Sequence, residues 1–421
     1  MSSTGQNNWY FLIDCNQFFV SCEQLFNPKL LGKPTVVLSS NDGCVVSRSK
    51  EAKEIGIPMG APLYQLEQLM KRYKVHALSS NFELYGDMSF RVMQVLSTFS
   101  PDMEEYSIDE AFLKITALNP LPIAIQIKAA VERLTGIPVS IGIGITKTLA
   151  KVAGDIAKKK SSGCFFLHDN VDEILAKLSP VDIWGIGNRI AADLKSYHIH
   201  TALDVKKADD TWIQKKFSVV LLRTVWELRG RECIKHIEVD TPRKSITSSK
   251  SFGRPVTELT DLEEAVSTYM AKASSKLRKE GSLAKVICVF ISTSRFQEDS
   301  YYNYRIITLP QSSDYTPDLI SYAKSALKQI FKEGYSYKKA GVTLFELSPK
   351  NCVQLDLFSP PPSTNTKHSE AMQVLDKIKS RLGKDAICFA SEGIDKSWKG
   401  KQQHTSSRFT TRWDELLTIK I

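Results

Sequence analysis

One order of predicted elements occurs twice along the chain: strand, helix, strand, strand, helix, strand. The first copy begins with the apolar run WYFLID at 9–14, is interrupted by a small mixed segment at 19–79, and resumes over 80–170. The second copy spans 247–350, where a helix from Asp261 carries an apolar stripe suited to packing on a sheet. This order is that of a ferredoxin-like split β-α-β sheet. The sequence therefore predicts an α+β multidomain protein with two such modules.

Helices predominate between the two copies, at residues 171–237. Their central segment, WGIGNRIAADL, places Gly185 and Gly187 between two short predicted helices, the pattern of a helix-hairpin-helix. Glycine there lets backbone N–H groups approach DNA phosphates, although a tight turn without a DNA role is the alternative for this pattern alone. A polar linker is expected at 238–246, and the Pro/Ser/Thr-rich tract within 351–421 cannot build a core.

Three carboxylates are expected at strand ends of the first copy. Asp14 ends the first strand, and Asp109 and Glu110 are adjacent in the hairpin EEYSIDEAFLKI. The two strands are neighbours in this fold, so the three acids can gather into one site. Like carboxylates repel one another, and Mg²⁺, which binds carboxylates together with phosphates and water, would relieve that repulsion. Two ions about 3.5–4 Å apart would serve phosphoryl transfer.

The adjacency of Asp109 and Glu110 needs an explanation, because neighbouring residues of a strand face opposite sides. An isolated Asp-Glu pair is usually a solvated turn, and only its surroundings favour a site here. Both acids can face Asp14 if a turn or bulge occupies Ser107 to Glu110 and the strand begins near Ala111.

Charge and composition narrow the choice of partner and compartment. The 56 Lys and Arg against 46 Asp and Glu leave a formal charge of +10, which favours a polyanionic partner. The eight cysteines form no C-x-x-C pair and have no nearby His at ligand spacing, which argues against a zinc site or a disulfide framework. No apolar run approaches a membrane span. A cytoplasmic protein without a membrane partner is expected.

Five segments, in conserved order and spacing along the chain, together resemble the Y-family translesion DNA polymerases, most closely the UmuC type. They are FLIDCNQFFVSCE, GKPTVVLSSNDGCVVSRSKEAKEIGIPMG, SSNFELYGDMSFRVM, EEYSIDEAF and GIGITKTLAKVAGDIAKKK. The resemblance implies a right-hand polymerase, error-prone in SOS-type mutagenesis and DNA repair, located in the bacterial cytoplasm at the nucleoid. Its implied domains are a palm (9–18 and 80–170), small fingers (19–79), a helical thumb (171–237), a linker (238–246), a little finger (247–350) and a tail (351–421).

The resemblance also implies roles for single residues in deoxynucleotidyl transfer. Two Mg²⁺ ions would be held by Asp14, Asp109 and Glu110, with the Cys15 carbonyl as a further ligand. Residues implied to bind the dNTP are Phe18, Phe19, Ser47, Lys53 and Lys158, with Ser47 and Lys53 on a fingers helix.

Phe19 falls on the steric-gate position, where a ring excludes a 2′-hydroxyl. Without the resemblance, a core Phe would be the simpler interpretation. The chain departs from many relatives at two positions, because Lys50 stands where others have Tyr and Lys53 where many have Arg. Lysine binds phosphate as a point charge, whereas arginine can donate two parallel hydrogen bonds. The contacts with the triphosphate are therefore expected to differ from those in relatives that have arginine.

The partners implied are primer-template DNA and proteins of the replication fork. QLDLF resembles the pentapeptide that docks bacterial polymerases on the sliding clamp, with Gln354, Leu355, Leu357 and Phe358 as its contacts. The tail ending RFTTRWDELL implies contacts with a UmuD-like accessory dimer and with RecA.

Two other classes of function compete with a polymerase. A non-catalytic checkpoint factor that binds DNA and the clamp has no need of three acids. A metal-dependent nuclease shares the ion chemistry, but it does not account for Phe19 or for the inserted segment at 19–79.

Overall fold

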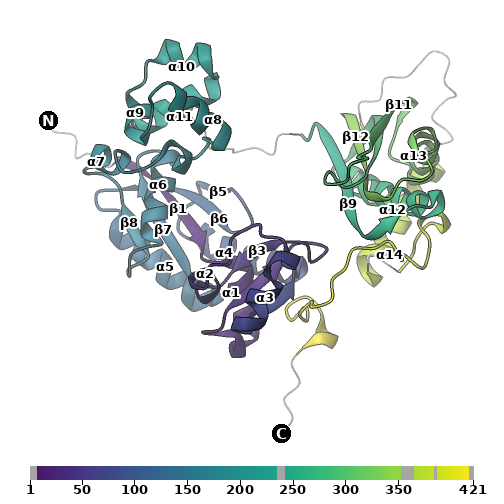
Figure 1. Ribbon diagram of the computed structural model, residues 1–421, viewed down its shortest axis with the longest axis horizontal. Coiled ribbons are helices and arrows are strands. Elements are labelled where there is room, and N and C mark those ends of the chain that lie inside the picture. The colour runs from purple at the N-terminus through teal and green to yellow at the C-terminus, as the bar shows by residue number, and fades with distance from the viewer. Residues whose placement is uncertain (1–6, 235–241, 352–364, 384–385, 417–421) are drawn as a thin grey trace, which may run out of the picture. The chain divides into compact units, whose positions relative to one another are not determined.

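The computed structural model describes residues 7–234, 242–351, 365–383 and 386–416 (Figure 1). The chain forms two compact units. The first combines Met1–Asp240 with Gln403–Ile421, and the second is Thr241–Gln402.

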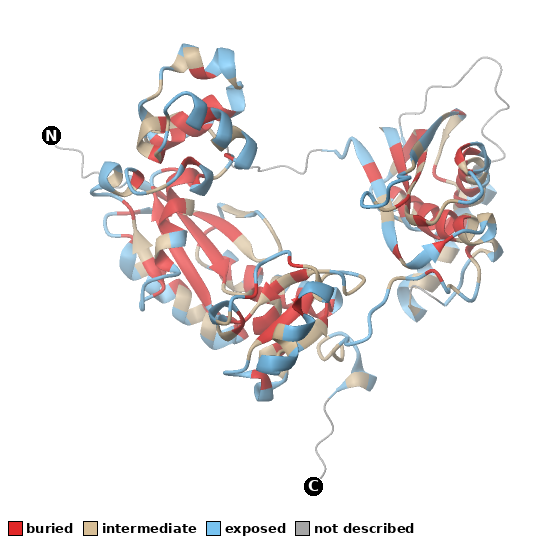
Figure 2. Cartoon of the chain, in the orientation of Figure 1, coloured by how far each residue is buried: buried red, intermediate tan, exposed pale blue. Residues whose placement is uncertain are grey.

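A five-stranded sheet of order β5-β6-β1-β7-β8 is the centre of the first unit. Its middle strand β1 pairs antiparallel with β6 and β7, and every residue of β1 from Trp9 to Cys15 is buried because both faces of the sheet are covered (Figure 2). On one face Trp9, Phe11 and Ile13 pack against α4 and α5, and on the other Tyr10 and Leu12 meet α6. The elements are β1 Asn7–Cys15, α4 Phe82–Ser97, β5 Met103–Glu105, β6 Glu110–Ala117, α5 Leu121–Thr135, β7 Val139–Gly144, α6 Lys147–Ala157 and β8 Cys164–Phe166.

Glycine in β7 brings α6 unusually close to the sheet. A Cβ atom at Gly142 would lie 2.1 Å from the backbone nitrogen of Gly154 and 2.3 Å from the carbonyl oxygen of Ala150, so no larger residue fits. The motif SIGIG therefore determines how near α6, with its lysines, lies to the strands that carry the acids.

The inserted segment forms a second, smaller sheet of order β3-β2-β4. Its elements are α1 Phe18–Phe26, η1 Pro28–Leu30, β2 Thr35–Leu38, β3 Val45–Arg48, α2 Lys50–Glu54, α3 Leu63–Tyr73 and β4 His76–Ser79. The expectation that Ser47 lies on a helix is wrong. Residues 45–48 pair with β2, and the Ser49 hydroxyl accepts the Ala52 N–H, so that the helix starts only at Lys50.

The helical segment contains α7 Val171–Leu175, η2 Pro180–Asp182, α8 Asn188–Ser196, α9 Ala202–Lys207, α10 Asp210–Lys216 and α11 Val219–Leu228. Its core includes Leu194, Val205, Ile213 and Leu222 and is shared with Leu149 and Val152 of α6. Gly185 and Gly187 separate η2 from α8, as the sequence predicts.

The second unit confirms the second copy of the β-α-β-β-α-β order. A four-stranded antiparallel sheet, β11-β10-β12-β9, packs against α12 and α13 around a single large core. After it, α14 and η4 pack on α12, where Arg278 pairs with Asp376 at 2.7 Å. The elements are β9 Ser245–Val256, α12 Leu259–Lys279, β10 Ser282–Ser292, β11 Tyr302–Ser313, α13 Thr316–Ile330, β12 Tyr337–Pro349, α14 Asn365–Leu382 and η4 Ala390–Glu392.

The final described segment belongs to the first unit. Residues 403–416, which include η5 Trp413–Glu415, lie against β4 and the start of α4, and Thr405 forms an isolated parallel bridge with Ser79. The expected tail at 351–421 therefore divides between the two units.

Candidate active site

Asp14 and Glu110 come together at the end of the central strands. They are directly opposite in the register of β1 and β6, and side chains of opposed antiparallel residues lie on the same face. Asp14 is buried, with 8% of its surface exposed. The Cys15 N–H donates to the Asp109 carbonyl at 2.8 Å, which brings the third acid to the same end of the sheet.

A bend at Ser107–Asp109 explains how the adjacent acids are accommodated. The Ser107 hydroxyl accepts the Glu110 N–H at 3.0 Å and donates to Asp109 Oδ1 at 2.6 Å. The predicted turn is confirmed, and the strand begins at Glu110, one residue before Ala111, because Glu110 already pairs with Asp14.

Two lysines of the α6 region neutralise these acids. Lys158 Nζ lies 2.7 Å from Asp14 Oδ2, and Lys151 Nζ lies 3.0 Å from Glu110 Oε2. Lys158 is one of the predicted nucleotide-binding residues, whereas Lys151 was not predicted. Its signal in the sequence was present, since residues four and seven apart share a helix face and Lys147, Lys151 and Lys158 follow that spacing.

Burial and neighbouring charges shift the pKa values of these groups. Burial raises the pKa of Asp14 to about 6; Lys158 opposes the rise and Glu110 adds to it. The pKa of Lys158 is raised, because Asp14 outweighs the effect of burial. Desolvation lowers the pKa of Lys53, as do the positive charges of Arg48 and Lys158. Lys53 and Lys158 thus form one positive region beside the acids.

The residues fit a hard cation. Within the described residues, no three His, Cys, Asp or Glu side chains form a ready-made metal cluster. Asp14 and Glu110 nevertheless present carboxylate oxygens to one another, and ammonium groups stand beside both as countercharges. Hard oxygen donors such as these suit Mg²⁺ better than a soft metal.

The predicted gate ring belongs to α1, the helix that begins three residues after the end of β1. Phe19 is partly buried, and its ring stacks on Tyr85 of α4 with centroids 4.5 Å apart and planes 13° apart. Phe18 is instead a core residue, 3% exposed. The simpler interpretation of Phe19 as a core residue is therefore correct only in part.

The residues of the inserted segment that are predicted to bind phosphate differ in their exposure and in their hydrogen bonds. Ser47 is buried, accepts the Val20 N–H at 3.4 Å and donates to the Gln17 carbonyl at 3.3 Å, so its hydroxyl holds the start of α1. Arg48 lies on β3 and donates to the Ile57 carbonyl. Lys53 and Lys50 are exposed.

The glycine hairpin of the helical segment is also exposed. Gly185 has φ +89°, and Gly187 is the N-cap of α8 with open space where a Cβ would lie. Trp184 donates from Nε1 to the Tyr106 hydroxyl at 3.0 Å, and Lys151 Nζ lies 4.7 Å from the centroid of the Tyr106 ring. These contacts join the hairpin to the end of the sheet where Glu110 lies.

The predicted clamp-binding residues fall outside the described part of the chain; they are Gln354, Leu355, Leu357 and Phe358. No helix in the described part of the chain is long and apolar enough to cross a membrane.

Comparison with known proteins agrees with this geometry. Residues 13–155 match the impB/mucB/samB family, 243–357 match its C-terminal domain, and 369–419 match a domain of unknown function. Protein UmuC of Salmonella typhimurium is 39% identical over 98% of this chain and 100% of its own length. DNA polymerase IV of Bacillus anthracis is 30% identical over 94% of this chain and 96% of its own.

A solved structure shares the fold. A Y-family DNA polymerase chimera of Dbh and Dpo4 aligns with a TM-score of 0.66 at 20% identity, covering 81% of this chain and 99% of its own. The three sheets, the helical segment and the acid pair, together with these matches, identify a Y-family DNA polymerase. The chain belongs to the impB/mucB/samB family and is of the UmuC type. The predicted fold class and the predicted activity, a translesion DNA polymerase, are confirmed; enzymes of this class bind primer-template DNA and use divalent metal ions.

Proposed function

We propose that the chain inserts deoxynucleotides opposite damaged template bases by an error-prone, two-Mg²⁺ mechanism centred on Asp14, Asp109 and Glu110. The observation that carries this assignment is the opposed pair Asp14 and Glu110, with a lysine beside each. When bound, Mg²⁺ would offset the carboxylate charge and stabilise the attacking and leaving oxygens. The Cys15 carbonyl completes the ligand set.

The surrounding residues bind and orient the substrates. Lys158 and Lys53 meet the charge of the triphosphate, which grows during phosphoryl transfer. Phe19 excludes the 2′-hydroxyl of a ribonucleotide, while Phe18 and Ser47 hold the backbone from which that ring projects. Gly185 and Gly187 are exposed residues, and their backbone N–H groups bind phosphates of the primer-template without reading its sequence.

Protein partners follow from the same assignment. Gln354, Leu355, Leu357 and Phe358 dock on the sliding clamp, and the tail takes part in contacts with a UmuD-like accessory dimer and RecA. Because its proposed substrate is DNA, the protein is expected to act in the bacterial cytoplasm at the nucleoid.

The deciding experiment is primer extension with Mg²⁺ and dNTPs across an abasic site, with and without clamp, accessory dimer and activated RecA. Asp109→Ala and Glu110→Ala are expected to abolish extension while primer-template affinity is retained. Glu105→Gln is the matched control, because Glu105 is exposed on the same hairpin. Extension that survives both alanine changes contradicts the site.

Two further outcomes would replace the proposed activity. Degradation of labelled DNA with Mg²⁺ and no nucleotides would indicate a nuclease. An unmutated chain that extends no primer with any partner would indicate the checkpoint binding factor.

A further inference from the structure

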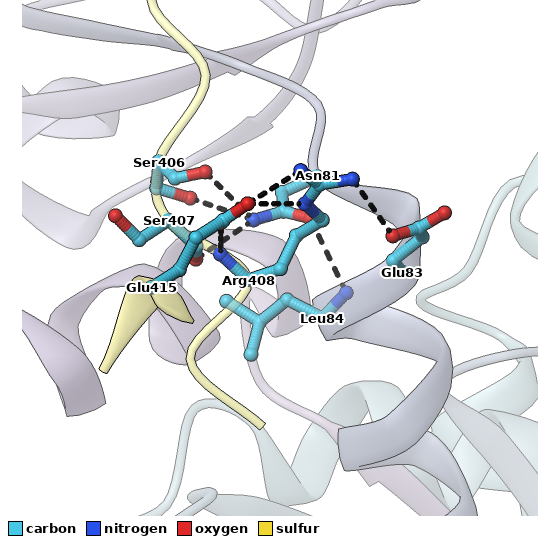
Figure 3. Close-up of polar contacts among 7 residues, drawn as sticks. All are labelled: Asn81, Glu83, Leu84, Ser406, Ser407, Arg408 and Glu415. Atoms are coloured by element: carbon cyan, nitrogen blue, oxygen red, sulfur yellow. Dashed lines mark hydrogen bonds and ion pairs between the residues drawn. The ribbon is translucent and has the colours of Figure 1, made fainter. Parts of the chain in front are cut away.

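Polar contacts hold the tail segment 403–416 on the first unit, which carries the acid site, and several of them involve buried residues. The Asn81 side-chain amide donates to the Ser406 and Ser407 carbonyls at 3.1 Å each and to the Ser406 hydroxyl oxygen at 3.0 Å (Figure 3). Asn81 also caps α4, since its Oδ1 accepts the Leu84 N–H at 3.3 Å. One residue therefore begins helix α4 and binds the tail.

Further contacts extend the attachment on both sides of Ser406. The His404 carbonyl accepts the Ser79 N–H, and the His404 N–H donates to Ser79 Oγ, both at 3.0 Å. Phe409 stacks on Phe26 of α1 with centroids 5.0 Å apart and planes 8° apart. Backbone pairing, side-chain hydrogen bonds and ring stacking together show a built contact surface.

The tail also reaches a carboxylate that has no part in the acid site. Glu23 of α1 is 2% exposed, and its Oε1 accepts hydrogen bonds from the Tyr85 hydroxyl at 2.6 Å and the Ser406 hydroxyl at 2.9 Å. Burial raises the pKa of Glu23, and these two donors oppose the rise. A buried carboxylate without its partners is costly, so loss of Ser406 favours rearrangement of Glu23 and Tyr85.

Glu23 and Tyr85 connect the tail to the gate ring. Glu23 follows Phe19 by four residues on α1, and the Tyr85 ring is the surface on which the Phe19 ring stacks. The Tyr85 hydroxyl thus donates a hydrogen bond to Glu23, and the face of the Tyr85 ring stacks against the Phe19 ring.

We propose that Ser406 and Glu23 are positioning residues for sugar selection, and that docking of the tail through Ser406–Glu23–Tyr85 holds the Phe19 ring in the position that rejects ribonucleotides. This inference rests on the proposed role of Phe19 as the gate. It assigns to the last part of the domain of unknown function at 369–419 a role within the enzyme's own chain.

The test compares the affinities of a dNTP and the matching rNTP for the full-length protein on a dideoxy-terminated primer-template with Mg²⁺, so no turnover is needed. Ser406→Ala is expected to lower the preference for the dNTP by about threefold or more, through the lost hydrogen bond to the buried Glu23. Ser407→Ala is the matched control, because Ser407 binds Asn81 through its carbonyl. Phe409→Ala, which removes the stacking on Phe26, is expected to act like Ser406→Ala.

The double variant separates positioning from a general loss of stability. In a Phe19→Ala background, Ser406→Ala should have no further effect on the preference, since the ring it positions is gone. If Phe19→Ala lowers the preference while Ser406→Ala and Phe409→Ala leave it unchanged, the positioning role of the tail is disproved. The assignment of Phe19 as the steric gate is then retained. If Phe19→Ala itself changes nothing, the gate assignment fails and the inference with it.

Discussion

Lys147 is wholly buried and pairs with Glu104: its Nζ lies 2.6 Å from Glu104 Oε2, and its side chain is 1% exposed. Lys147 is the first residue of α6, and Glu104 lies on β5 in the hairpin that carries Asp109 and Glu110. The pair therefore fastens the helix that bears Lys151 to the strands that bear the acids.

Removal of the Lys147 ammonium is expected to be strongly destabilising. Lys147→Ala leaves Glu104 poorly solvated and opens a cavity, and the free energy of unfolding should fall by about 3–5 kcal/mol. Lys50→Ala, which removes only an exposed lysine 4.0 Å from Glu54, should change it little. Urea unfolding followed by circular dichroism measures both; equal effects would show that burial of the pair is unimportant.

Gly142→Ala and Gly86→Ala should change stability in opposite directions. The alanine methyl at 142 would overlap the backbone of α6, so we expect a loss of about 1–3 kcal/mol or more. Gly86 is exposed in the interior of α4 with nothing within 4 Å of a Cβ, so alanine should stabilise by about 0.5–1 kcal/mol. Thermal unfolding of the two variants tests the close approach of α6; a neutral Gly142→Ala would disprove it.

Phe19→Ala is expected to increase ribonucleotide insertion. Without the ring, the 2′-hydroxyl meets no obstacle, so the ratio of kcat/KM for dNTP to that for rNTP should fall at least tenfold, about 1.4 kcal/mol of discrimination. Phe90→Ala is the control, because Phe90 is an exposed ring on α4. An unchanged ratio in Phe19→Ala would place the gate elsewhere.

The buried Glu23 should make stability depend on pH. Its pKa is raised in the folded state, so the folded state binds its proton more tightly than the unfolded state does. Stability associated with Glu23 is therefore present below the ordinary glutamate pKa and is lost as pH rises through the folded value. Glu23→Gln cannot ionise but keeps an acceptor oxygen, so its melting temperature relative to the unmutated chain should rise from pH 4 to pH 7; a constant difference would show that Glu23 does not titrate anomalously.

The sequence predicted the parts of the site that depend on strand order and local turns. Asp14 ends an apolar run that is typical of a buried strand, and the Asp109–Glu110 pair required a bend, which is present. The position of Ser47 was predicted wrongly, because VVSR suits either a strand or a helix start and only pairing with β2 decides between them.

Contacts between distant segments were beyond prediction. Ser406 meets Glu23 across 383 residues, and neither residue has a spacing or periodicity that indicates the other. The position of Lys151 on one face of α6 could have been predicted from its spacing to the other lysines. Its pairing with Glu110 could not, because it depends on the close approach of α6 to the sheet at Gly142.

The tail is attached to the unit from which its own chain departed some 160 residues earlier, because the intervening segment Thr241–Gln402 forms the other unit. The contact is therefore unimolecular, and dilution of the protein does not weaken it. A partner that binds residues 403–416 must compete against an effective concentration set by the length and folding of the intervening chain, and not by the amount of polymerase in the cell. Recruitment through the tail and release of the tail are consequently one equilibrium, and each affinity can be measured by the change it causes in the other.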